Sequence, residues 1–208
     1  GLLGPNDCLV ILDDDGNFTS QLTVQQSGLS GKPITIIGET GGSANIAVAG
    51  GSARCIFING HDRISIYNIA VSGATIGNIE GNGVTDYITI SGVTSTGGAA
   101  SLWLDEGVGC VVTNNNVTQG SSFGLVLFTD VTGALVDGNT FTGIPGQTQV
   151  YGLYFRYADN LTYTNNTVNN WSLNAASNAV VYFSEVDGLT VYGNTYSGCD
   201  AVTHYYLT

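Results

Sequence analysis

One short pattern recurs four times in the second half of this chain, and it limits the possible folds more than any other feature. The pattern is φ-x-φ-x-x-N-x-φ, in which φ is mostly apolar. From residue 110 to residues 134, 161 and 189, successive copies begin 24, 27 and 28 residues apart. A unit this short cannot bury its own apolar face, so the repeat predicts a stacked solenoid. The copies are Cys110–Val117, Ala134–Phe141, Leu161–Val168 and Leu189–Tyr196.

The first half of the chain continues the same columns with less regular spacing. Three short strand-forming runs, separated by Gly, Asn and Asp, follow one another in each unit, which predicts a three-sided coil. Alternation along each strand places one column of side chains inward and its neighbours outward. Three columns are expected to face the core: Ile34, Ile64, Ile88, Cys110, Ala134, Leu161 and Leu189; then Ile36, Ile66, Ile90, Val112, Val136, Tyr163 and Val191; and Ile58, Leu104, Phe128, Phe155 and Phe183.

A polar column accompanies the apolar ones. Asparagine occupies the same place in four successive units, five residues after the first inward column. An asparagine there can turn a corner, because it tolerates left-handed backbone, and its amide can hydrogen-bond to the units above and below. We therefore expect a structural ladder of Asn115, Asn139, Asn166 and Asn194.

These repeats resemble those of the right-handed parallel β-helix superfamily, the pectate-lyase-like fold. The segment Gln21–Gly38 also resembles the opening coil of many secreted members. The resemblance covers nearly the whole chain and implies an all-β, single-stranded parallel β-helix of about seven coils. It implies little about function, because lyases, glycosidases, adhesins and phage tailspikes share this fold. The capping helix that members commonly carry at the N-terminal end has no counterpart in this sequence.

The resemblance therefore predicts one domain over residues 1–208. Residues 1–21 form an N-terminal edge or cap, residues 22–203 form the coils, and residues 204–208 begin a further strand or a C-terminal cap. An open end of a solenoid exposes core and strand edges, so the ends are expected to be capped or covered by a partner. No signal peptide is visible and the chain starts at Gly1, so we expect that a leader was cleaved or an initiator Met trimmed. The absence of a purification tag favours a whole native polypeptide over a cut-out fragment.

Charge and cysteine content exclude several kinds of partner and site. A net charge of −12 with 4 Lys plus Arg argues against nucleic acid and anionic membranes, both of which need clustered cations. The four cysteines lack zinc-site spacing, so isolated or core thiols are expected, with a Cys8–Cys55 disulfide as the alternative. The acidic run Asp13–Asn17 departs from the calcium-loop pattern, so we expect no cofactor or metal, with Ca²⁺ as a weak possibility.

One outward face carries the candidate binding residues. Aromatic and apolar side chains lie there beside polar and acidic ones, which suits stacking on sugar rings or docking of a protein partner, including a second copy. A third alternative is that the C-terminal segment covers this face and makes it part of the core. The candidate ligand- or partner-binding residues are Phe57, Trp103, Asp105, Leu127, Tyr154, Arg156, Tyr182 and Glu185.

No established catalytic motif of the superfamily occurs in the chain. The lyases need a base beside an acidic substrate, and the glycosidases need paired carboxylates with downstream His and Arg–Lys motifs. If the chain is an enzyme, Arg156 with Asp130 and Glu185 forms the cluster to test. We predict a non-enzymatic β-helix, extracellular or on a virion surface, with a structural, decoration or glycan-attachment role. The alternative is a polysaccharide lyase-like enzyme or a fragment of one.

Overall fold

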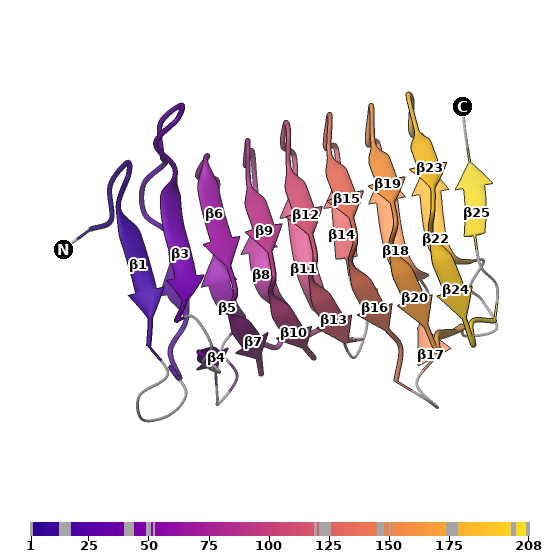
Figure 1. Cartoon of the computed structure of the whole chain (residues 1–208), viewed down its shortest axis with the longest axis horizontal. Helices are drawn as coiled ribbons and strands as arrows, with labels where there is room; N and C mark the ends of the chain where they lie inside the picture. The colour runs from indigo at the N-terminus through magenta and orange to yellow at the C-terminus, as the bar shows by residue number, and fades with distance from the viewer. Residues whose placement is uncertain are drawn as a thin grey trace.

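A computed structural model shows an elongated stack of coils that runs from the N-terminus to the C-terminus (Figure 1). The structure describes residues 2–12, 18–39, 44–48, 51, 53–118, 120, 126–144, 148–149, 151–173, 179–200 and 203–206. No helix occurs among these residues. The acidic run Asp13–Asn17 lies outside them.

Three parallel sheets form the sides of the stack, and each coil after the first contributes one strand to each sheet, up to β23 and β24. Sheet A contains β1 (Cys8–Ile11), β3 (Ile34–Gly38), β6 (Ile64–Tyr67), β9 (Thr89–Ser91), β12 (Val111–Thr113), β15 (Leu135–Asp137), β19 (Thr162–Thr164) and β23 (Thr190–Tyr192). Sheet B contains β4 (Asn45–Ala47), β7 (Ala70–Ser72), β10 (Thr94–Thr96), β13 (Asn116–Thr118), β16 (Thr140–Thr142), β20 (Thr167–Asn169) and β24 (Thr195–Ser197). Sheet C contains β2 (Leu22–Thr23), β5 (Arg54–Phe57), β8 (Gly77–Gly81), β11 (Ala100–Asp105), β14 (Val126–Thr129), β18 (Tyr151–Arg156), β22 (Ala179–Ser184) and β25 (Thr203–Tyr206).

The predicted all-β parallel β-helix is confirmed, although its number of turns differs slightly from the expected seven. A separate pair, β17 (Thr148–Gln149) and β21 (Ser172–Leu173), joins two loops between sheets B and C. Among the described residues, no helix is long and apolar enough to cross a membrane.

The strand register confirms the inward columns. Ile36 pairs with Ile66, and the same column continues through each coil to Val191. Its members are fully buried from Ile36 to Tyr163, which gives the solenoid one continuous apolar core. In the later coils aromatic rings fill this core: Phe155 stacks on Phe183 with ring centroids 5.2 Å apart, and both meet Tyr163 edge to face.

The predicted asparagine ladder is also present. Each side-chain amide donates to the side-chain oxygen of the asparagine in the next coil, at 2.9 Å for Asn115 to Asn139 and Asn139 to Asn166, and at 3.0 Å for Asn166 to Asn194. That same oxygen accepts the backbone N–H of the asparagine before it. The inner three members are buried, so the ladder satisfies polar groups that water cannot reach.

A second column of turns places Asn and Gly alternately in left-handed backbone. It begins at the A-to-B corner with Asn68 (φ 50°) and Gly92 (φ 67°), and alternates up to Asn165 (φ 53°) and Gly193 (φ 69°). A Cβ on Gly92 would lie 2.3 Å from Oδ1 of Asn68, so the asparagine side chain occupies the space that glycine leaves free.

All four cysteines are free thiols, so the Cys8–Cys55 disulfide alternative is wrong. Cys8 is exposed on the edge strand β1, whereas Cys55 is buried between sheets B and C. The Cys55 thiol donates to the carbonyl of Ser72 at 3.1 Å, in a buried polar cluster with Asn78. Burial raises the pKa of the Cys55 thiol and raises that of Cys110 to about 11.

Candidate functional site

Most of the candidate residues form two rows on the outer face of sheet C. Trp103, Leu127, Tyr154 and Tyr182 pair in register on β11, β14, β18 and β22. A second row beside it contains Asp105, Thr129, Arg156 and Ser184. Both rows run along the axis of the stack, because each coil adds one residue to each row.

Two tyrosines form the most regular part of this face. The rings of Tyr154 and Tyr182 are parallel, with an interplanar angle of 0° and centroids 5.4 Å apart. Both side chains are half-buried, as are Phe57 and Trp103. Together they leave a partly exposed aromatic strip along the solenoid. The side chain of Leu127 lies outside the described residues.

The acidic residues beside the strip are held by specific contacts. The indole N–H of Trp103 donates to Oδ2 of Asp105 at 2.6 Å, which fixes the tryptophan ring relative to the carboxylate. The hydrogen bond also leaves Asp105 positioned at the edge of the strip, two residues along the strand from Trp103.

The predicted cluster around Arg156 is assembled in part. An Nη of Arg156 lies 4.0 Å from Oε1 of Glu185 and donates to the hydroxyl of Tyr157 at 2.6 Å. Its guanidinium also lies over the Tyr157 ring, 4.4 Å from the centroid. Asp130 contacts Arg156 through the backbone, where its N–H donates to the Arg156 carbonyl at 3.0 Å. Among the described residues no ion pair joins the Asp130 carboxylate to Arg156.

Protonation at this cluster follows from these contacts. The hydrogen bond to Tyr157 raises the pKa of Arg156, so the guanidinium stays charged. Burial raises the pKa of Tyr154, with the charge of Arg156 opposing the shift, so its phenol stays protonated at neutral pH. The described part of this face therefore offers tyrosine hydroxyls, the Arg156 guanidinium, and the carboxyl groups of Asp105 and Glu185.

The structure adds two residues to this face that the sequence pattern did not identify. Glu80 pairs with both Phe57 and Trp103, so it lies within the aromatic row, although it is 2% exposed. An Nη of Arg54 donates to Oε1 of Glu80 at 2.7 Å, and the Arg54 guanidinium lies 4.2 Å from the centroid of the Phe57 ring. Oε2 of Glu80 and Nε of Arg54 are buried without a hydrogen-bond partner.

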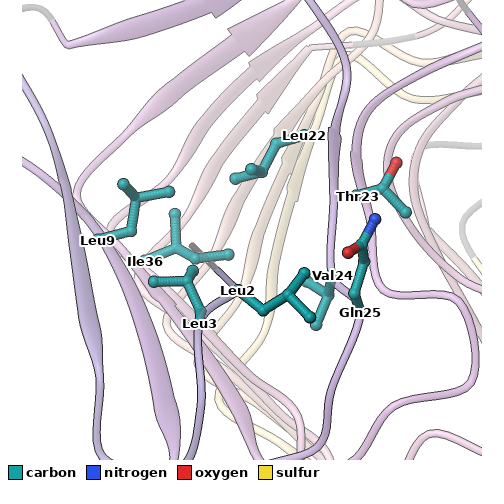
Figure 2. A pocket seen from close by; sticks show the side chains of 8 residues that line it. All are labelled: Leu2, Leu3, Leu9, Leu22, Thr23, Val24, Gln25 and Ile36. Atoms are coloured by element: carbon teal, nitrogen blue, oxygen red, sulfur yellow. The ribbon is translucent and has the colours of Figure 1, made fainter.

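A cavity of about 310 Å³ lies at the N-terminal end of the stack, where the core opens (Figure 2). Figure 2 shows that its lining is mainly apolar: Leu2, Leu3, Leu9, Leu22, Val24 and Ile36, with Thr23 and Gln25. Leu3 packs against the core, so the segment before β1 covers part of this end. None of the described residues that line this cavity is ionisable.

No group of three or more His, Cys, Asp or Glu in the described part of the chain has the geometry of a metal site. Among the described residues, the outer face of sheet C therefore combines the largest variety of side chains that could contact a ligand. Its aromatic rings, hydroxyls and carboxylates suit binding of a hydroxylated polymer.

Comparison with known proteins agrees with this architecture. The family described as "Right handed beta helix region" matches residues 54–207. Curated protein sequences give no match. Among solved structures, the crystal structure of an alginate lyase from Paenibacillus sp. str. FPU-7 is similar over 97% of this chain and 93% of that chain, with a TM-score of 0.58 and 15% sequence identity. At this identity the likeness shows the fold alone. The chain belongs to the right-handed β-helix family.

Proposed function

We propose that this protein is a non-enzymatic, extracellular or virion-surface β-helix that attaches to glycans through the outer face of sheet C. The observation that carries the proposal is the parallel pair of Tyr154 and Tyr182, with centroids 5.4 Å apart and both rings partly exposed. The stacked rings cover each other's inner faces and present their exposed edges and hydroxyls in a row along the axis, which suits the C–H and hydroxyl groups of a linear glycan lying across several coils.

Charge favours a neutral glycan over a polyanionic one. The protein carries a net charge of −12, and on this face the carboxylate of Asp105 contacts Trp103 while that of Glu185 faces Arg156. The exposed cation of this face, Arg156, already faces Glu185 at 4.0 Å. An acidic polymer would meet repulsion from this surface, whereas carboxylates accept hydrogen bonds from neutral sugar hydroxyls.

Binding of a neutral polysaccharide panel by isothermal titration calorimetry tests the proposal. We expect a member of the panel to bind, and Tyr154→Ala and Tyr182→Ala each to weaken binding at least tenfold. Tyr192→Ala is the matched control, because Tyr192 is 61% exposed on sheet A, away from this face. If all three variants bind with the affinity of the wild type, the glycan binds at another surface.

The alternative function is a polysaccharide lyase. It is favoured by the Arg156 guanidinium, which donates to the Tyr157 hydroxyl at 2.6 Å next to Glu185, because a tyrosine held by an arginine can act as the proton-abstracting group of a lyase. Lysis of a uronate polymer forms an unsaturated product that absorbs ultraviolet light. Such a product from an acidic polysaccharide, lost in Arg156→Ala, would replace the non-enzymatic proposal by the lyase.

A further inference from the structure

A second hollow, of about 360 Å³, lies on a different part of the molecule, at the turns that lead from sheet C to sheet A. Its lining comprises Leu29, Ser30, Gly31, Pro33, Arg63 and Tyr87. This volume is at the lower end of the range for small-molecule sites. None of these residues belongs to the face proposed to bind glycan.

One wall of the hollow is a tight turn. Leu29 and Lys32 exchange two backbone hydrogen bonds, at 2.9 Å and 2.8 Å, around Ser30 and Gly31. Gly31 adopts the left-handed conformation that this turn requires, with φ of 70°. The turn holds Leu29 58% exposed beside Pro33, so an apolar surface faces solvent on a fixed backbone.

The opposite wall is a stacked pair of side chains. The guanidinium of Arg63 lies 4.6 Å from the centroid of the Tyr87 ring. A Cβ on Gly109, one coil further, would lie 3.0 Å from the Tyr87 ring, so the absence of a side chain at Gly109 leaves room for that ring. Tyr87 therefore has Arg63 stacked on its ring and the Gly109 backbone beside it, while the residue remains 48% exposed and can meet a ligand.

Both members of the pair have an unusual backbone. Arg63 and Tyr87 have φ of 55° and 57°, at a corner where the later coils place Gly109, Gly133 and Asn160. Large side chains are uncommon in this conformation, and such residues cluster at binding sites. The two coils that form the hollow therefore depart from the pattern of the rest of the column.

Arg63 is also unusual in its charge environment. Arg54 pairs with Glu80 and Arg156 faces Glu185, but no carboxylate in the described part of the chain forms an ion pair with Arg63. The adjacent Asp62 accepts the backbone N–H of Asp86 at 3.0 Å. Asp86 in turn accepts the backbone N–H of Val108 at 2.9 Å, so both nearby carboxylates have other hydrogen-bond donors.

We propose that this hollow binds a small organic carboxylate, with the carboxylate on the Arg63 guanidinium and the apolar body against Leu29, Pro33 and Tyr87. A guanidinium offers paired N–H donors that match a carboxylate, and a stacked arginine loses little freedom on binding. The Ser30 hydroxyl adds a hydrogen-bonding group at the turn. The apolar wall and the single cation together select for a carboxylate with an apolar body over an inorganic anion.

Benzoate and benzamide test this site, because they share an apolar ring and differ in charge. In a ¹H–¹⁵N NMR titration at constant ionic strength, we expect benzoate to shift amides of residues 29–32, 63 and 87, and benzamide to bind at least tenfold more weakly. Arg63→Asn removes the cation and retains a residue that tolerates left-handed backbone. This variant should weaken benzoate binding at least tenfold and leave benzamide binding unchanged.

Two further variants separate charge from the apolar wall. Leu29→Ala should weaken both probes by a similar factor, because it trims an exposed side chain without changing charge. Arg156→Gln removes one positive charge several coils away and should leave benzoate binding within twofold of the wild type. The proposal is overturned if benzoate fails to bind, if benzoate and benzamide bind alike, if Arg63→Asn has no effect, or if the shifted amides lie elsewhere.

Discussion

Oδ1 of Asn165 lies 2.4 Å from the position that a Cβ on Gly193 would occupy in the next coil. Both residues are in left-handed backbone, with φ of 53° and 69°. The same relation links Asn68 to Gly92 and Asn114 to Gly138. Coils can therefore stack at this corner where an asparagine on one coil meets a glycine on the next.

This relation predicts that Gly193→Ala destabilises the protein for two separable reasons. The left-handed backbone alone should cost about 1–2 kcal/mol, and the contact with Asn165 should add to it. Gly83→Ala is the matched control for backbone strain, because Gly83 has φ of 78° and no atom within 4 Å of a Cβ. Urea denaturation should give a larger loss for Gly193→Ala than for Gly83→Ala, and Asn165→Gly should recover part of the difference. Equal losses would mean that the asparagine moves aside without cost.

The ladder makes a second prediction. Asn166→Leu should lower the free energy of unfolding by about 1–3 kcal/mol. The substitution removes the acceptor of two hydrogen bonds from Asn139 and a donor to the Val136 carbonyl. Asn116→Leu, at an exposed position of β13, is the control and should change stability little. Thermal or urea denaturation of the two variants is the measurement. An unchanged melting temperature for Asn166→Leu would show that the ladder is dispensable.

The buried pair of Arg54 and Glu80 should behave as a unit. Arg54→Met leaves the Glu80 carboxylate buried and uncompensated, so we expect a loss of about 3–5 kcal/mol. Replacing both residues, as Arg54→Met with Glu80→Leu, should recover much of this loss, since an apolar pair needs no counter-charge. A double-mutant cycle by urea denaturation measures the coupling. If the effects of Arg54→Met and Glu80→Leu simply add in the double variant, the two residues are not coupled and the prediction is wrong.

The thiols should differ in reactivity and in their response to pH. A thiol reagent should modify exposed Cys8 in the folded protein, and Cys55 and Cys110 after unfolding. Since folding raises the pKa of Cys110 from 9.0 to about 11, the folded state holds this proton more tightly. Ionisation of Cys110 therefore leaves the free energy of unfolding unchanged below about pH 9. Between pH 9 and 11 it lowers the free energy of unfolding, by about 3 kcal/mol in all. Cys110→Ala should show a correspondingly weaker loss of stability over that window, and an unchanged slope would contradict the shift.

The sequence predicted the sheets and the ladder because the later coils repeat the same φ-x-φ-x-x-N-x-φ pattern, although the coils differ in length. Ile36, Val136 and Tyr163 could be placed in one column by counting, and their neighbours followed from alternation. Stacking requires successive coils to match, so regular spacing in the sequence reports directly on register. This part of the fold needed no knowledge of long-range contacts.

The same counting missed Glu80, because its coil has Gly81 where the other coils place Leu104 or Phe155. A charged residue in an aromatic row is stable there through Arg54, which reaches it from the preceding coil. A pair of this kind depends on side-chain geometry between coils, which alternation does not encode. The pairing of Arg63 with Tyr87 escaped the sequence for the same reason.

The most direct test of the proposed glycan site is the affinity of one neutral polysaccharide for the wild-type protein and for the double variant Tyr154→Ala/Tyr182→Ala, with Tyr192→Ala alongside. Circular dichroism should first show that all three proteins are folded. We expect the double variant to bind at least a hundredfold more weakly and Tyr192→Ala to bind like the wild type. Undiminished binding by the double variant, or absence of binding by the wild type across the panel, would contradict the proposed role of the sheet C face.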